Sequence, residues 1–192
     1  MTAAPSIESV NQFTYNDALR HPKEPSQSVG RSLEQFLKLT ATRGSWYGGG
    51  SAVALACALS AALLEKLVDQ SPYAASLRAL RVRCAQLVEE DAVTFAGVIK
   101  AYYQQDRAAA KRSLKGAIAI PVAVHEAARR ILTAAQEARK RINPRYRSDL
   151  TCVVALARAA RVASEAFIDT NLKWLDDPAY ARRVTKQLAR RS

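Results

Sequence analysis

Two polar side chains stand where the hydrophobic pattern of a helix predicts apolar ones, and they are the strongest candidates for chemistry. On the segment 75–103, apolar residues recur every three or four positions, and Asp91 falls on their stripe. A carboxylate is rarely buried without a partner, so Asp91 is either a capped or salt-bridged structural residue, or a carboxylate with a tuned pKa that lines a pocket. The stripe consists of Leu77, Leu80, Cys84, Leu87, Asp91, Phe95, Val98 and Tyr102.

A second stripe, on 149–175, contains Asn171, for which a structural role is a weaker explanation than it is for Asp149 on the same stripe. Asparagine is a poor former of helix interiors, yet it occupies an apolar position there. Asp149 lies in the first turn of that helix, where the helix dipole stabilises an anion. A structural role therefore explains Asp149 as well as a functional role does. His125, near a stripe on 107–141, is interpreted as exposed or structural. The second stripe comprises Asp149, Val153, Leu156, Ala160, Ala163, Phe167, Asn171 and Trp174.

The glycines Gly48, Gly49 and Gly50 precede Ser51 and a long run of alanine and leucine. Glycine permits a tight turn and lets a ligand approach the backbone closely. The free N–H groups at the start of the following helix can then bind an anionic or carbonyl oxygen. By itself a glycine-rich loop is a weak signal.

The elements that position these residues are expected to be helices throughout. We expect an all-α, antiparallel, up-and-down bundle of long helices, with an alanine-rich central helix over about 50–69. Pro121 should kink the fourth helix, and Ser148 should cap the fifth. Residues 1–29 are expected to form a polar extended leader, and 30–192 a single domain. The expected helices cover 31–41, 50–69, 75–103, 107–141, 149–175 and a basic segment from Pro178, and Ser71-Pro72 ends the second.

Counting residues from the expected turns tests whether the polar residues share a level. Neighbouring antiparallel helices rise by about 1.5 Å per residue, so equal counts from a turn lie side by side. The count places Gly50, Asp91, Pro121 and Asn171 in one layer. Asp149 precedes Asn171 by 22 residues, about 33 Å along a helix. It therefore belongs elsewhere, or a second subunit of a symmetric dimer brings it in.

Composition narrows the function classes. The net charge is +12, with basic clusters at 139–147 and at the C-terminus. These clusters form either a solvated surface or a binding site for an anionic small ligand or for nucleic acid. The sequence has no nucleic-acid-binding motif and only 7% of its residues are aromatic, so nucleic-acid binding is disfavoured. Cys57, Cys84 and Cys152 all lie in apolar helical patterns and are expected to be buried free thiols. The apolar run 52–64 is short for a membrane span, so we expect a cytoplasmic protein.

Several blocks together resemble the cyclodeaminase/cyclohydrolase family, which includes the C-terminal domain of formiminotransferase-cyclodeaminase and bacterial methenyltetrahydrofolate cyclohydrolase. In order, they are GGGSAVALACALSAAL, EEDAVTFAGVIKAY, AIAIPVAVHEA, NPRYRSD at 143–149 and TNL at 170–172. The resemblance covers about 31–175. Phe167, Ile142, Arg145 and Tyr47 depart from the family pattern, whereas the glycines, Ser51, Asp91, Asn143, Ser148, Asp149 and Asn171 match it.

The resemblance implies a homodimeric enzyme that acts on a tetrahydrofolate derivative without a metal. It implies catalytic roles for Asp91, Asp149 and Asn171, and substrate binding by Gly48, Gly49, Gly50, Ser51, Asn143 and Ser148. The length favours methenyltetrahydrofolate cyclohydrolase, which hydrolyses the methenyl to the formyl derivative. The alternatives are a formiminotetrahydrofolate cyclodeaminase, a non-catalytic relative that binds a ligand or anionic partner, and a helical nucleic-acid-binding protein.

Overall fold

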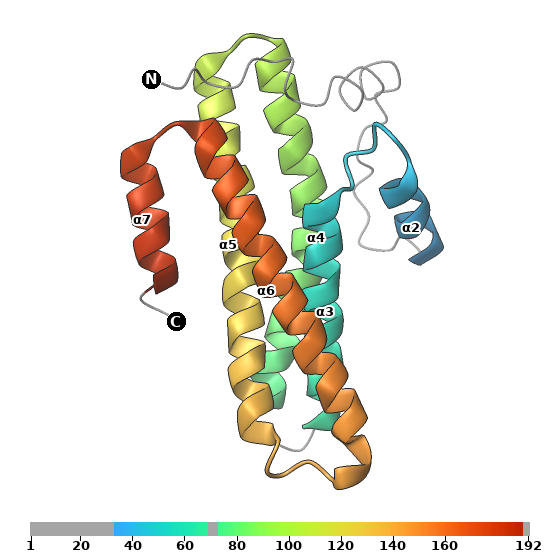
Figure 1. The fold of residues 1–192 in the computed structure, drawn as a ribbon. Helices are drawn as coiled ribbons and strands as arrows, with labels where there is room; N and C mark the ends of the chain where they lie inside the picture. The colour runs from blue at the N-terminus through green and yellow to red at the C-terminus, as the bar shows by residue number, and fades with distance from the viewer. Residues whose placement is uncertain (1–32, 69–72, 190–192) are drawn as a thin grey trace.

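The computed structural model describes residues 33–68 and 73–189, and within these ranges the chain forms helices and connecting loops without a strand (Figure 1). This confirms the expected all-α class. Each long helix packs against the one that follows it, and α6 packs back on α3, which closes an up-and-down bundle. The elements are α2 (Leu33–Ala41), α3 (Gly49–Leu67), α4 (Ala74–Tyr103), α5 (Arg107–Ala138), the 3-10 turn η2 (Pro144–Tyr146), α6 (Arg147–Leu175) and α7 (Pro178–Ala189).

The four bundle helices differ in length, and this difference leaves room for a cavity at the level where the shortest of them begins. α3 has 19 residues, about 28 Å, whereas α4 has 30 residues, about 45 Å. Beyond Gly49 the bundle therefore has three helices where it has four below, as the ribbon shows (Figure 1). The buried apolar side chains accordingly form two clusters: a large one around α3, which includes Ala54 and Val124, and a smaller one beneath α7, which includes Val98 and Ile168.

α3 is alanine-rich because it packs on several sides. Small side chains let its backbone approach α4 and α6 closely, and Ala54, Cys57 and Ala61 are completely buried. By length and composition it could also cross a membrane, but 39% of its most apolar window is buried inside the fold. The central helix of a globular bundle meets the same criterion, so the expectation of a non-membrane core helix is retained.

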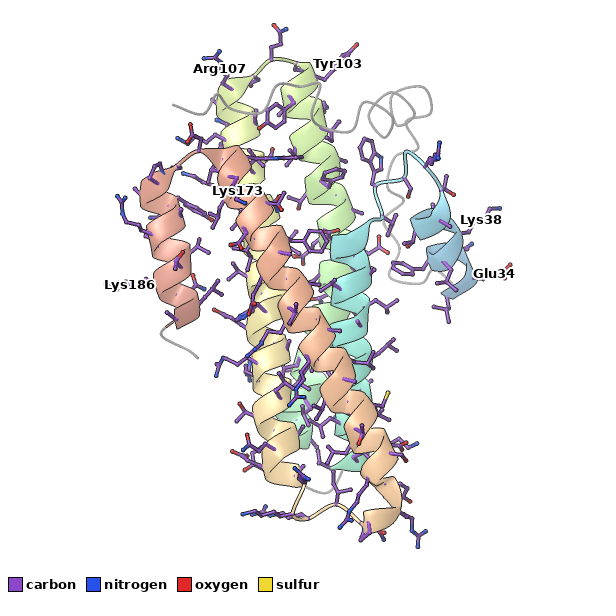
Figure 2. All side chains as sticks on the ribbon, in the orientation of Figure 1. Glu34, Lys38, Tyr103, Arg107, Lys173 and Lys186 are labelled. Carbon is purple, nitrogen blue, oxygen red and sulfur yellow. The ribbon has the colours of Figure 1, made fainter. Side chains whose placement is uncertain are left out.

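The outer helices attach to this bundle through few side chains. Phe36 of α2 packs edge-on against Tyr47, with ring centroids 6.1 Å apart. The charged Glu34 and Lys38 of α2 project away from the bundle (Figure 2). Asp177 begins α7, accepting a hydrogen bond from the Tyr180 N–H at 3.0 Å.

Two expectations for individual residues are wrong. Ser148 does not cap α6, because α6 begins at Arg147 directly after η2, and Asn143 instead caps that turn by accepting from the Arg145 N–H at 3.1 Å. Cys152 is exposed rather than buried, whereas Cys57 and Cys84 are buried. The reason is that the apolar pattern of α6 is wider than the face that this one chain covers. The predicted leader 1–29 and the Ser71-Pro72 break lie outside the described residues.

Candidate functional site

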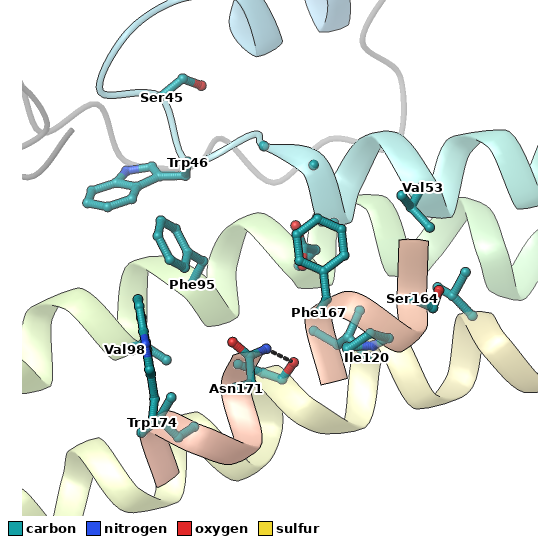
Figure 3. A pocket seen from close by; sticks show the side chains of 18 residues that line it. Ser45, Trp46, Val53, Phe95, Val98, Ile120, Ser164, Phe167, Asn171 and Trp174 are labelled. Carbon is teal, nitrogen blue, oxygen red and sulfur yellow. Dashed lines mark hydrogen bonds between the residues drawn. The ribbon is translucent and has the colours of Figure 1, made fainter. Parts of the chain in front are cut away.

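A cavity of about 280 Å³ lies at the level where α3 begins. Its walls come from α4, α5 and α6, and the segment before α3 covers it (Figure 3). The cavity is lined by Gly48, Gly49, Gly50, Asp91, Pro121 and Asn171, so the layer obtained by counting helix residues corresponds to a real cavity.

Asp91 sits directly on the first turn of α3. Its Oδ2 accepts a hydrogen bond from the Ser51 Oγ at 2.8 Å, and the carboxylate also accepts from the Ser51 backbone N–H. A Cβ built on Gly50 would lie only 2.3 Å from Oδ1. Gly50 is therefore required because the carboxylate occupies the place of a side chain, and Asp91 of α4 acts as the missing N-cap of α3.

This arrangement puts opposing influences on the Asp91 pKa. Burial raises the pKa above the ordinary aspartate value, and the two hydrogen bonds from Ser51 lower it, with burial the larger effect. Asp91 also lines the cavity. A carboxylate of raised pKa that faces a ligand site can exchange a proton near neutral pH more readily than an ordinary aspartate.

Asn171 is held by α5 in a way that the sequence did not reveal. Its Nδ2 donates to the Ala117 carbonyl at 3.0 Å. In a regular helix that carbonyl accepts from the N–H four residues later, but residue 121 is a proline and has none. The Asn171 amide replaces the donor that Pro121 lacks, and its Oδ1 lies on the opposite side of the carboxamide, the side on which Val98 and Trp174 line the cavity (Figure 3).

Aromatic rings supply much of the rest of the wall. Trp46 and Phe95 pack edge-on with centroids 6.4 Å apart, and Phe167 and Trp174 line the side formed by α6. Phe167 covers the glycines so closely that a Cβ on Gly49 would lie 2.6 Å from its Cζ. Sequence reasoning missed Trp46, because helical periodicity gives no information on the direction of a loop. Phe95 and Trp174 were on the predicted stripes and could have been assigned to the cavity.

Three of the expected site residues do not line this cavity. Asn143 and Ser148 are exposed, and Asp149 is half-buried in the first turn of α6, at the opposite end of that helix from Asn171. Within one chain the structure therefore separates them from Asp91. His125 is also outside the cavity; it is buried and its Nε2 lies 3.0 Å from Glu165 Oε1, which agrees with a structural role.

The arrangement favours a flat ligand that is cationic or rich in N–H donors. The wall combines aromatic faces with two acceptors, the Asp91 carboxylate and the Asn171 Oδ1. The backbone of Gly48, Gly49 and Gly50 also lines the cavity, and the Ser51 N–H next to it donates to Asp91. Across 33–68 and 73–189, no group of three or more His, Cys, Asp or Glu side chains is arranged to hold a metal ion.

Comparisons with known proteins point in one direction. A family model described as formiminotransferase-cyclodeaminase matches residues 32–190. The fold resembles the crystal structure of formiminotetrahydrofolate cyclodeaminase from Thermotoga maritima, with a TM-score of 0.78 and 20% identity, over 84% of this chain and 88% of that chain. No curated protein sequence matches the chain. At this identity the structural match establishes the fold, and the family match covers most of the chain.

Proposed function

The chain belongs to the formiminotransferase-cyclodeaminase family, and on this basis we propose that it is a folate-dependent one-carbon enzyme whose substrate binds in the cavity at the start of α3. The observation that carries the proposal is the Asp91 carboxylate, held against the first turn of α3 and facing an aromatic cavity. The reacting carbon of these folates lies between two nitrogens as a planar amidinium cation. Aromatic walls and a buried carboxylate complement such a group.

The reaction we propose first is the cyclodeamination of formiminotetrahydrofolate. The sequence had favoured methenyltetrahydrofolate cyclohydrolase, with the cyclodeaminase as an alternative. The family description and the name of the structurally similar enzyme both support that alternative better. Cyclohydrolase activity remains the second candidate, because water can attack the same amidinium carbon in the same cavity.

In the proposed reaction the second folate nitrogen attacks the formimino carbon, and the carbon–nitrogen bond to the leaving amino group then breaks. The attacking nitrogen loses one proton and the departing ammonia gains one, so a single group can move the proton between them. We assign this transfer to Asp91, whose pKa is raised by burial and whose carboxylate faces the cavity. The Asn171 Oδ1 accepts from an N–H of the amidine and holds its plane against the aromatic wall. In the hydrolytic alternative Asp91 takes the proton from the attacking water.

We further propose that the protein is a homodimer that pairs through α3 and α6. Two neighbouring helix faces are apolar and incompletely covered, with Leu59 at 53% and Val162 at 60% exposure. Exposed apolar side chains gathered on adjoining helix faces are typical of an interface between subunits. The α3 face carries Ala52, Leu55, Ala56, Leu59, Ala62 and Leu63, and the α6 face carries Cys152, Ala155, Leu156, Ala159, Val162, Ala163 and Ala166.

A two-fold pairing of this surface offers a role for the separated site residues. The α6 stripe is symmetrical about Ala159, so antiparallel pairing there sets the partner's Cys152 against Ala166. The same pairing brings the partner subunit's Ser148 and the partner subunit's Asp149 toward Thr170, next to Asn171. It also covers the exposed thiol of Cys152. In this proposal Asn143, Ser148 and Asp149 complete the site of the neighbouring subunit.

The test of function is to mix purified protein separately with formiminotetrahydrofolate and with methenyltetrahydrofolate. Formation of the methenyl chromophore and release of ammonia report cyclodeamination, and decay of the chromophore reports hydrolysis. Asp91→Asn should abolish the activity, whereas Asp106→Asn, at the exposed N-cap of α5 where asparagine can also cap, should retain it. If wild type changes neither substrate beyond the uncatalysed rate, the proposed function is wrong.

A further inference from the structure

Pro121 has no polar side chain, yet it determines which groups the cavity offers to a ligand. It lies inside α5, a helix that otherwise continues from Arg107 to Ala138, and it lines the cavity. Its missing N–H leaves the Ala117 carbonyl without its regular helical partner. That carbonyl accepts from the Asn171 Nδ2 at 3.0 Å.

The Ala117 carbonyl fixes the orientation of the Asn171 amide. A carbonyl oxygen only accepts, so the nitrogen of the carboxamide must face it and the oxygen must face away. Figure 3 shows this oxygen on the side away from Ala117, toward the cavity. If Pro121 were an ordinary residue, its N–H would engage the Ala117 carbonyl and weaken the hold on Asn171.

We infer that Pro121 is a positioning residue that acts through the Ala117 carbonyl to present Asn171 to the cavity as a hydrogen-bond acceptor. The site then offers two acceptors, the Asp91 carboxylate and the Asn171 Oδ1, and selects ligands with N–H donors at both places. The ligand class rests on the proposed function, but the link among Pro121, Ala117 and Asn171 does not.

The link is tested by a double-mutant cycle on thermal unfolding with Pro121→Ala and Asn171→Leu. Asn171→Leu alone leaves the Ala117 carbonyl unpaired, and its melting temperature should fall by about 5 °C. In the Pro121→Ala background the new N–H pairs with that carbonyl, so the same change should lower the melting temperature by less than half as much. Pro178→Ala, at the first turn of α7, is the matched control background, in which the full effect should persist. An equal loss in the wild-type and Pro121→Ala backgrounds overturns the inference.

A second measurement separates positioning from support of the helix. In the folded enzyme, Pro121→Ala should lower kcat/KM several-fold through KM, because the acceptor that holds the substrate is less well oriented. Pro178→Ala should leave both constants unchanged. Unchanged kinetics in Pro121→Ala would mean that the hydrogen bond is only structural, and would overturn the positioning role. If wild type turns over no folate but the cycle shows coupling, the link among the three residues stands and the proposed function fails.

Discussion

The three consecutive glycines give the sharpest prediction, because the structure assigns each of them a different environment. A Cβ on Gly50 would lie 2.3 Å from Asp91 Oδ1 and 2.7 Å from Asp91 Cγ. That is about 1 Å closer than ordinary van der Waals contact. In Gly50→Ala the carboxylate must therefore leave its place, and both hydrogen bonds from Ser51 are lost or weakened.

The expected loss follows from those contacts. Hydrogen bonds to a charged group contribute about 1.5–3 kcal/mol each. Alanine in a helix recovers up to about 1 kcal/mol relative to glycine. We therefore expect the free energy of unfolding of Gly50→Ala to fall by about 2–4 kcal/mol, which corresponds to roughly 5–15 °C in the melting temperature. The loss of activity should be severe, since the displaced group is Asp91.

The neighbouring glycines serve as matched controls. A Cβ on Gly48 meets no atom within 4 Å, so Gly48→Ala should leave the free energy of unfolding unchanged or raise it slightly. A Cβ on Gly49 meets only the ring edge of Phe167 at 2.6 Å, and because the ring can turn aside we expect a loss of about 1 kcal/mol.

Urea unfolding followed by circular dichroism measures the series. A second test is Gly50→Ala in an Asp91→Ala background, where the new methyl group enters space that the carboxylate has vacated and should cost little. If Gly50→Ala is as stable as Gly48→Ala, the carboxylate does not rest on the first turn of α3, and the description of the site is wrong.

Three further predictions concern Asp91 and the subunit contact. Ser51→Ala removes a hydrogen bond that lowers the Asp91 pKa, so the acidic limb of the kcat/KM–pH profile should move to higher pH; an unmoved limb would assign it to another group. Because burial raises the folded-state pKa of Asp91, its contribution to stability is fully present below its unfolded pKa of about 3.9 and is lost as pH rises through the folded value. Asp91→Asn does not titrate, so urea unfolding should show the free energy of unfolding of the variant rising relative to wild type as the pH increases above about 4, and a constant difference would contradict a raised pKa. Leu59→Glu should give monomers in sedimentation velocity and lower the activity, whereas Val82→Glu, on the exposed side of α4, should do neither; a dimeric Leu59→Glu would place the interface elsewhere.

The layer of site residues could be predicted from the sequence because short turns leave little freedom in how long helices align. Equal counts from the turns brought Gly50, Asp91, Pro121 and Asn171 to one level, and they line one cavity. The cavity itself was also implicit in helix length, since the helix expected over 50–69 was shorter than those expected over 75–103, 107–141 and 149–175. The cavity forms because α3 begins part of the way along the other three bundle helices, and the helix lengths alone imply this.

Side-chain partners could not be predicted in the same way. Periodicity places Asn171 on a face but does not show that its amide meets the Ala117 carbonyl, because that depends on the rotation of α6 against α5. The cover provided by Trp46 depends on a loop, which has no repeating pattern. The error on Cys152 has a further cause: an apolar stripe shows which side chains avoid water but not whether the same chain covers them.

The structural and functional interpretations of Asp91, which the sequence presented as alternatives, describe one arrangement. The carboxylate caps α3 through Ser51, and this fixes its position at the cavity wall. The cap also limits the effect of burial, because a carboxylate without those donors would have a still higher pKa and would be protonated over more of the pH range. A proton-transfer group must be both fixed and able to ionise near working pH. In the proposed reaction the first turn of α3 serves both requirements, since Gly50 makes room for the carboxylate and Ser51 supplies donors that keep its pKa from rising further.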